Sequence, residues 1–244
     1  MEQLWFTALL NRLFGGVVYS LLIHLGIHIN PKHAATPISN SFAMEVMVAL
    51  LLITFFAAVR LRLSVEQPGT LQQAAEWIES FIGNMGHEII GHHYKPYHAY
   101  LVTLGLFILT CNLIGIIPSF ESPTAVPIVP LGCALLTWSY YHFQGLRSNG
   151  FGYFKHFMGP VWWLAPLMLP IEIFSHTARL LSLTVRLFAN MFAGEMVTLV
   201  FFSLVPIGLP IVFEGLHIGV SLIQTYIFVI LACVYLGEAT AHEH

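Results

Sequence analysis

Aspartate is absent from this sequence, and charged residues of every kind make up only 9% of its 244 positions. A water-soluble domain normally has about a quarter of its residues charged. Hydrophobic residues fill 57% of the chain instead. The composition therefore excludes an ordinary soluble protein and predicts an integral membrane protein. The net charge of −3 says little about its partners.

Cysteine and the common catalytic motifs are equally scarce. The three cysteines, Cys111, Cys133 and Cys233, all lie in apolar runs without paired spacing, so no disulfide or metal framework is expected. The chain has neither a glycine-rich phosphate loop nor a nucleophile elbow, and no catalytic residue or cofactor is predicted. Its first residues lack the basic leader and cleavage site of a signal peptide, so no cleaved segment is expected.

A histidine-rich stretch, GHEIIGHHYKPYH, raises the alternative of a membrane zinc hydrolase. Such enzymes use H-E-x-x-H, which places two histidines one helical turn apart with the glutamate as the base. Here the next histidine after His87 is His92, roughly 140° around a helix, and Gly91 interrupts the segment. We therefore predict no metal site.

Hydrophobic runs of spanning length are the main positive feature. A helix needs about 20 residues to cross the hydrocarbon core of a bilayer, which is about 30 Å thick. Three runs fit, at about 42–59, 98–117 and 126–143. A fourth, 171–204, contains no proline and a single glycine; as roughly 50 Å of helix it must tilt or bend. After the break VPIGLP, a fifth run at 211–236 forms an antiparallel hairpin with it.

The predicted fold is an all-α integral membrane protein with about five transmembrane helices and one surface helix. Residues 70–90 carry apolar side chains at helical spacing, as in an amphipathic helix lying on a membrane surface. Residues 1–41 are expected to form an outer N-terminal segment, and 42–244 a single membrane domain. Polar residues interrupt the apolar stretch 4–29, which favours an interfacial helix there over a sixth span.

Basic residues in the loops predict the orientation, because they concentrate on the cytoplasmic side. The loops after the first and third runs hold most of them: Arg60, Arg62, Lys95, Arg147 and Lys155. The opposite side receives only Arg12 and Lys32. We expect the N-terminus outside, the 205–210 turn outside and the C-terminus inside.

Polar side chains form one stripe along each helix of the hairpin. At about 100° per residue, those of the first helix fall within roughly 80° of one another; they are Glu172, Ser175, Arg179, Ser182, Arg186 and Asn190. Glu195 points away from this stripe. The second helix carries a stripe of its own, made of Glu214, His217, Ser221 and Gln224.

Folding the hairpin at about residues 207–208 brings the two stripes to similar depths. Three pairs then lie near one another: Glu195 with His217, Asn190 with Thr225, and Arg186 with Gln224. Protonatable groups thus enter from both ends of the hairpin, with one fixed positive charge between them.

Arg186 is the unusual residue, since an arginine at bilayer depth costs on the order of a few kcal/mol or more. It stays protonated at physiological pH, so it repels protons instead of relaying them, and its charge stabilises a nearby carboxylate in the ionised form. The pattern predicts two offset half-channels and a charged gate that acts on a partner's carboxylate. The alternative is a structural arginine paired with Glu195 or Glu172. Arg179 is expected to extend to the interface.

These segments resemble a known family. SLTVRLFANMFAGE is similar to the signature of the a subunit of the membrane (Fo) sector of F-type ATP synthase, and GLHIGVSLIQTYIFVILACVYL resembles that family's last helix. NLIGIIP and SPTA also resemble family segments. The resemblance covers about residues 40–244 and is most specific at 171–236. The sequence departs from the family in AVPIVPLGCALL, which lacks the usual Asn and Thr, and at Gly115, where some members carry an acid.

The resemblance implies a proton-conducting stator subunit of a rotary ATP synthase that is not catalytic on its own. It implies that Arg186 faces the rotor ring of c subunits. The implied outer half-channel contains Asn190, Glu195, His217 and Gln224, to which the second stripe adds Glu214. The implied inner half-channel contains Glu172 and Ser175, to which the first stripe adds Ser182.

The implied partners are the c ring, the b-subunit peripheral stalk, the remainder of the complex, protons and the lipid bilayer, with no nucleic acid. ATP chemistry then belongs to another subunit. The unprocessed N-terminus and the length favour a bacterial inner membrane. An independent ion transporter is the other alternative; such proteins often show paired repeats with broken helices, and this sequence shows no internal repeat.

Overall fold

The computed structural model describes residues 4–24, 36–117, 120–153, 163, 165–204 and 208–240. Within these ranges every regular element is helical, as expected of a chain whose backbone must satisfy its hydrogen bonds without water. Five helices are long and apolar enough to cross a membrane: α1 (Trp5–His24), α2 (Asn40–Leu61), α4 (Lys95–Ile114), α7 (Ala165–Leu204) and α8 (Leu209–Thr240). The prediction of an all-α membrane protein is confirmed.

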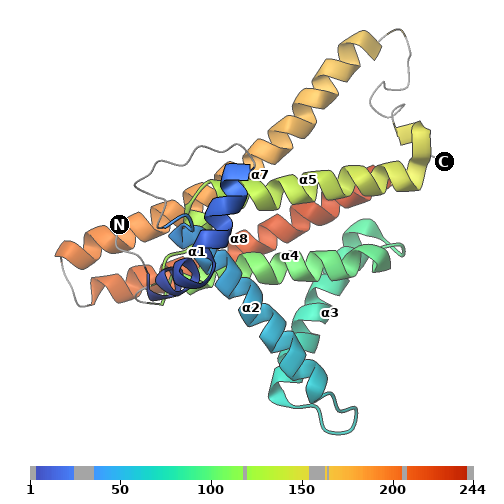
Figure 1. The fold of residues 1–244 in the computed structure, drawn as a ribbon. Helices are drawn as coiled ribbons and strands as arrows, with labels where there is room; N and C mark the ends of the chain where they lie inside the picture. Colours follow the sequence, from blue (N-terminus) through green and yellow to red (C-terminus); the bar gives the residue numbers. More distant parts are fainter. Residues whose placement is uncertain are drawn as a thin grey trace.

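The membership of these five differs from the expected set. They include α1, which we expected at the interface, and leave out α5 (Ile128–Asn149), which we expected to span. α5 is as long as α2 but ends in the polar stretch YYHFQGLRSN, which lowers its mean hydropathy. It nevertheless packs against both α7 and α8. α1 packs on α2 and runs at a steep angle to α4, α5 and α8 in Figure 1. The membrane placement of both helices stays a prediction.

Local chemistry explains where several helices begin and end. The N–H of Phe42 donates to the Ser39 hydroxyl at 3.3 Å, which caps α2. α3 (Thr70–Ile90) matches the range expected of the surface helix and ends at Gly91, whose φ of 85° favours glycine. α4 ends at Ile114, three residues before the expected 117.

α7 begins at Ala165, earlier than the expected 171, because the helix runs through Pro170. A proline inside a helix removes the bond to the carbonyl four residues earlier. Here that carbonyl belongs to Pro166, in the first turn, so little of the helix is disturbed. The 40 residues of α7 make roughly 60 Å of helix, twice the thickness of the hydrocarbon core. Figure 1 shows its first part extending beyond the other helices.

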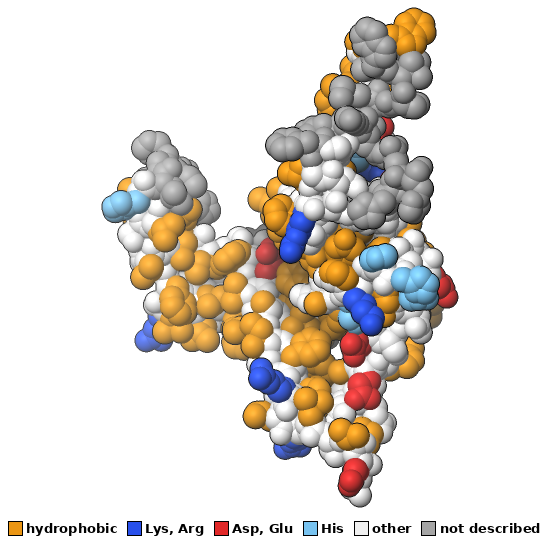
Figure 2. Space-filling view, turned by 90° about the vertical axis from the view of Figure 1, so that its right-hand side faces the viewer, with side chains coloured by type: hydrophobic (Ala, Val, Ile, Leu, Met, Phe, Trp, Pro, Cys, Tyr) orange, Lys and Arg blue, Asp and Glu red, His pale blue; other side chains and the backbone are white. Residues whose placement is uncertain are grey.

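The core lies where α4, α5, α7 and α8 meet. Its fully buried side chains include Leu101, Ile108, Leu187, Met191 and Phe228. Large apolar side chains also cover much of the outside, and Figure 2 shows a face on which charged side chains are sparse. This apolar exterior suits a surface that lipid or other membrane subunits surround.

Contacts between helix termini define one end of the bundle, called here the Glu238 end. Asn149, the last residue of α5, donates its side-chain amide to the carbonyl of Ala239 at 3.2 Å. Arg179, in the first half of α7, pairs with Glu238. The end of α3 lies beside Gly237. The ends of α3, α5 and α8 and the start of α4 therefore meet here.

The opposite end is called the Glu214 end. The Asn40 amide, at the start of α2, donates to Glu121 at 3.4 Å. A short 3-10 turn, η2 (Pro123–Ala125), follows α4 and packs on α7. α7 and α8 form the expected hairpin, which Gly208, with φ of 94°, helps to turn at this end.

The N-terminal helix is fixed to the Glu214 end by a buried side chain. The Asn11 amide donates to the carbonyl of Ile38 at 3.1 Å, and the N–H of Ile38 donates to the Asn11 oxygen at 3.0 Å. Asn11 thus holds the segment before α2. Residues 205–207, Lys32, Lys155 and the tail after 240, all used in predicting the orientation or the hairpin, lie outside the described residues.

Candidate functional site

Arg186 lies on the exposed side of α7. Leu183 and Leu187, beside it on the helix, are buried against other helices, whereas Arg186 is exposed. Within the described part of the chain, its guanidinium makes no ion pair or hydrogen bond. An unpaired arginine facing lipid is unfavourable. This surface therefore requires something other than lipid in front of it.

The two carboxylates that could have paired with Arg186 have other partners. An oxygen of Glu195 accepts the N–H of Ser122 at 3.0 Å. An oxygen of Glu172 lies 3.2 Å from Nε2 of His176. The interpretation of Arg186 as a structural residue paired with either of them is therefore wrong.

One helical turn from Arg186, the two polar stripes meet. The side-chain amide of Asn190 on α7 donates to the Gln224 oxygen on α8 at 2.7 Å. Gln224 is only 2% exposed. The hairpin places Gln224 one residue from the position expected for the partner of Asn190, so these two predicted residues form a direct contact.

His217 lies against Gly194 farther toward the Glu214 end. A Cβ at Gly194 would lie 3.4 Å from the imidazole ring, an ordinary van der Waals distance, so the ring packs directly on this part of α7. A cavity of about 250 Å³ between α7 and α8 is lined by Asn190, Gly194, His217 and apolar neighbours. The buried Nε2 of His217 has no hydrogen-bond partner among the residues described. Buried polar atoms of this kind are normally satisfied by water, and the cavity has room for it.

Glu195 belongs to a network that joins three helices, α4, α7 and α8, to the turn at η2. Besides its N–H to Glu195, Ser122 contributes a hydroxyl 2.8 Å from the Thr124 hydroxyl. Thr124 donates to the Asn112 oxygen at 2.7 Å, and the Asn112 amide lies 3.4 Å from the Thr225 hydroxyl on α8. Sequence analysis did not identify Thr124 or Thr225 as site residues. The only signal was their place in the SPTA and IQT segments.

Two further carboxylates gather at the Glu214 end. Glu121 is exposed and Glu214 is half-buried. Both are close enough to Glu195 to interact with it electrostatically. Glu214, which the sequence placed on the second stripe, therefore lies beside the other predicted residues.

The Glu238 end holds a separate polar cluster. Glu172 pairs with His176, and Nδ1 of His176 lies 2.8 Å from the Tyr141 hydroxyl on α5. Arg179 pairs with Glu238 and lies 4.9 Å above the ring of Tyr235, instead of extending alone to the interface.

The two serines expected beside Glu172 do not join this cluster. Ser182 is exposed, and its hydroxyl donates to the carbonyl of Arg179 at 3.0 Å. Ser175 is half-buried and makes no side-chain hydrogen bond within the residues that the structure describes. Glu172 contacts His176, and His176 contacts Tyr141, where the stripe predicted the two serines.

Comparison with known proteins identifies the family. Residues 41–237 match the family described as ATP synthase A chain. The chain belongs to this family. It is 61% identical over 244 residues to "ATP synthase subunit a" of Koribacter versatilis, covering 100% of this chain and 99% of that one. It is 49% identical over 211 residues to "ATP synthase subunit a" of Solibacter usitatus, covering 86% and 91%. It is 45% identical over 195 residues to "ATP synthase subunit a 1" of Syntrophotalea carbinolica, covering 80% and 83%.

The space beside Gly115 is taken by Ser122 and Glu195. A Cβ at Gly115 would lie 2.7 Å from Cβ of Ser122 and 3.1 Å from the Glu195 oxygen. We expect Gly115→Ala to displace the turn and to lower stability by about 1–3 kcal/mol, the usual cost of overpacking. Thermal unfolding of the purified chain in detergent measures this loss.

The matched control is Gly132→Ala on α5, where a Cβ would meet no atom within 4 Å. Its unfolding temperature should equal or exceed that of the unchanged chain, because alanine favours a helix. Equal unfolding temperatures for Gly115→Ala and the unchanged chain would show that the turn adapts without cost.

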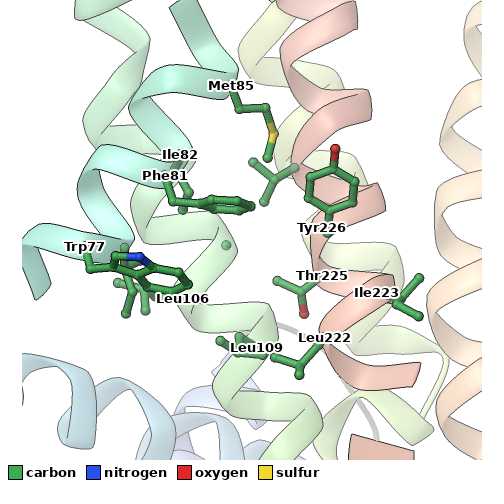
Figure 3. A pocket seen from close by; sticks show the side chains of 13 residues that line it. Trp77, Phe81, Ile82, Met85, Leu106, Leu109, Leu222, Ile223, Thr225 and Tyr226 are labelled. Atoms are coloured by element: carbon green, nitrogen blue, oxygen red, sulfur yellow. The ribbon is translucent and has the colours of Figure 1, made fainter. Parts of the chain in front are cut away.

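A larger cavity, of about 340 Å³, lies between α3, α4 and α8. Figure 3 shows Phe81 from α3, Leu109 from α4 and Tyr226 from α8 around it. The polar side-chain groups of its lining residues are the Trp77 indole N–H and the hydroxyls of Thr225 and Tyr226. We do not assign the site to this cavity, because it offers no group that titrates near neutral pH.

The histidine-rich segment forms the junction of α3 and α4. His87 and His92 have ring centroids 5.1 Å apart, and Nε2 of His98 lies 3.3 Å from Glu79. Across the described ranges, no three His, Cys or acidic side chains are placed to hold a metal ion. The geometry therefore gives no support to a zinc hydrolase.

Proposed function

We propose that this chain is the proton-conducting stator subunit of a rotary ATP synthase, with two offset half-channels separated by Arg186. The observation that carries the proposal is the exposed and unpaired Arg186, on a helix whose other exposed side chains are mostly apolar. Such a charge needs a counter-charge from outside the chain. A carboxylate on each subunit of a rotor ring supplies it in turn.

The outer half-channel is assigned to the Glu214 end. Glu195, Glu214 and His217 can exchange protons, and the cavity beside His217 leads toward Asn190. The contact between Asn190 and Gln224 is the last polar group before Arg186. The Thr124, Asn112 and Thr225 network extends the same path behind Glu195.

The inner half-channel is assigned to the Glu238 end, at Glu172, with Ser175 and Ser182 on the same stripe. Arg186 separates the two paths, since a permanently protonated guanidinium repels protons and favours an ionised carboxylate. A proton entering from outside neutralises a rotor carboxylate, which turns through lipid and releases the proton inward. Each proton supplies about 2.3 kcal/mol per 100 mV of membrane potential.

The orientation follows from the charges at the two ends of the bundle. The end of α2, the start of α4 and the end of α5 carry the basic residues Arg60, Arg62, Lys95 and Arg147. Contacts bring the start of α4 and the end of α5 to the Glu238 end, while the N-terminal helix attaches at the other end. Basic residues concentrate in the cytoplasm, so the Glu238 end and the C-terminus are assigned inside. The bilayer is then a bacterial inner membrane.

The proposed partners are the c ring, the b-subunit peripheral stalk and the remainder of the F-type complex. As a member of this family the chain is one subunit of a complex and not a catalyst on its own, and we expect it to take no cofactor. The Arg186 side of α7 is assigned to the c ring, because its polar groups remain uncovered by this chain.

Disulfide formation tests which partner covers this side. Ser182→Cys places a thiol on the exposed stripe one turn from Arg186, and Leu183→Cys places one on the buried face as the matched control. The native cysteines are all buried and should not compete. In the assembled complex, Ser182→Cys should form a disulfide with cysteines placed near the rotor carboxylate, and Leu183→Cys should not. Capture of the stalk subunit alone by Ser182→Cys would reject the assignment.

A further inference from the structure

The polar cluster at the Glu238 end encloses a small cavity that the proposed path does not yet use. It has a volume of about 40 Å³, enough for at least one water, which needs roughly 10–15 Å³ on this measure. Its wall consists of Tyr141, Tyr153, Glu172, His176, Arg179, Tyr235, Glu238 and Ala239. Three helices and the turn after α5 therefore contribute to one polar chamber.

His176 lies between two other residues of the chamber wall, Tyr141 and Glu172, and contacts each through one ring nitrogen. Nε2 lies 3.2 Å from the Glu172 carboxylate, and Nδ1 lies 2.8 Å from the Tyr141 hydroxyl. A carboxylate can only accept, so the neutral imidazole carries its hydrogen on Nε2 and accepts from Tyr141 at Nδ1. The His176 side chain is 12% exposed and that of Glu172 32% exposed. The imidazole is therefore more buried than the carboxylate that it contacts.

The other charged group of the chamber is neutralised. Arg179 would repel a proton arriving near His176, but Glu238 pairs with it and the ring of Tyr235 lies under it. His142 has its ring centroid 4.8 Å from that of His176, and its Nδ1 lies 2.7 Å from the Tyr153 hydroxyl. Burial raises the pKa of Tyr153 to about 12, so this phenol stays neutral and acts as a hydrogen-bonding group.

We propose that His176 passes protons between the Tyr141 hydroxyl and Glu172 across this chamber, and so forms part of the inner half-channel. This inference rests on the proposed function. In the inward direction, Nδ1 binds a proton delivered by chamber water or through the Tyr141 hydroxyl. Nε2 then gives its hydrogen to Glu172, which releases it to the inner solution. One proton enters at Nδ1 and one leaves from Nε2, so the imidazole ends with its hydrogen on Nδ1. It returns to the starting tautomer when Nδ1 gives up this hydrogen to chamber water and Nε2 takes one from the same water.

The test measures ATP-driven proton pumping by the whole complex in vesicles at a series of inner-side pH values. His176→Gln keeps a hydrogen-bonding side chain but cannot carry a proton. We expect the pumping rate to fall by about tenfold, less than the ~10²–10⁴ that a positioned acid–base group contributes in catalysis, because water can carry part of the flow. The pH dependence should also lose its component between about pH 5 and 8, where imidazole titrates.

The pH profile must be interpreted against the titratable and charged groups that face His176. They are Glu172 and Arg179 on α7, Tyr141 and His142 on α5, Tyr153 after α5, and Tyr235 and Glu238 on α8. Thr177→Ala is the matched control, since Thr177 is exposed on the next position of α7 and bonds only to its own helix. It should pump normally.

Tyr141→Phe provides a second variant if His176→Gln fails to assemble. It removes only the hydroxyl that meets Nδ1 and keeps the imidazole, so it should lower pumping while the imidazole component of the pH profile remains. A normal rate for either variant, or for His176→Gln a lower rate with the unchanged pH profile, would overturn the role of His176. Each variant is compared with an unchanged complex that pumps. Failure of the proposed function is a different result, because Arg186 variants would then pump normally as well.

Discussion

Arg186→Ala is expected to abolish ATP-driven proton pumping while leaving the complex assembled. Arg186 is exposed and makes no ion pair or hydrogen bond with other described residues, so its removal costs the fold little. Without its charge, nothing fixes the ionised state of the rotor carboxylate between the two paths. The measurement is dye-quenching by vesicles that contain the reconstituted complex, with the subunit content checked in the same preparation.

Passive proton flow distinguishes a lost gate from a blocked path. With the barrier removed, a potential imposed across the vesicles should drive a leak that the unchanged complex does not show. Arg147→Ala is the control, because Arg147 is also exposed but lies at the end of α5. Normal coupled pumping by an assembled Arg186→Ala complex would return Arg186 to a structural role.

Glu195→Gln is expected to slow pumping by about tenfold while preserving the turn at Ser122. The glutamine oxygen can still accept the Ser122 N–H, so the contact at 3.0 Å should survive. Glutamine cannot bind a proton at neutral pH. The effect stays below the ~10²–10⁴ of a sole acid–base group, because Glu121 and Glu214 lie nearby. Initial pumping rates at fixed ATP provide the measurement.

Two comparisons make the Glu195 result specific. Glu88→Gln changes an exposed glutamate on α3, away from the Glu214 end, and should leave the rate unchanged. Glu195→Ala loses both the proton and the hydrogen bond, so it should pump no faster than Glu195→Gln and unfold at a lower temperature. If Glu195→Gln pumps at the rate of Glu88→Gln, then Glu195 carries no protons.

The hairpin was the part that sequence could predict. Its two polar stripes recur at helical spacing, and a short turn fixes which residues lie side by side. This reasoning placed Asn190 opposite Thr225, one residue from its actual partner Gln224. It also placed His217 at the depth of Glu195, and the imidazole packs on the adjacent Gly194.

Contacts between segments far apart in the chain could not be predicted in this way. Ser122 and Glu195 are 73 positions apart, and no periodicity relates a turn to a helix that begins much later. His176 was not among the predicted site residues, because its partner Tyr141 belongs to α5, whose packing on α7 is a tertiary property. The predicted run began at residue 171, directly after Pro170, because a proline usually interrupts a helix. The helix begins earlier because its first turn tolerates the hydrogen bond lost at Pro170.

The surface around Arg186 also has a mechanical consequence. From Leu180 to Gly194, Arg186 is the sole charged residue, and its exposed neighbours Ser182, Val185 and Ala189 are short. A partner that slides along such a surface makes few polar contacts that must be broken, so it meets little friction. In the proposed function, the one guanidinium then holds each passing rotor carboxylate briefly, while the rest of this surface lets the ring slide past.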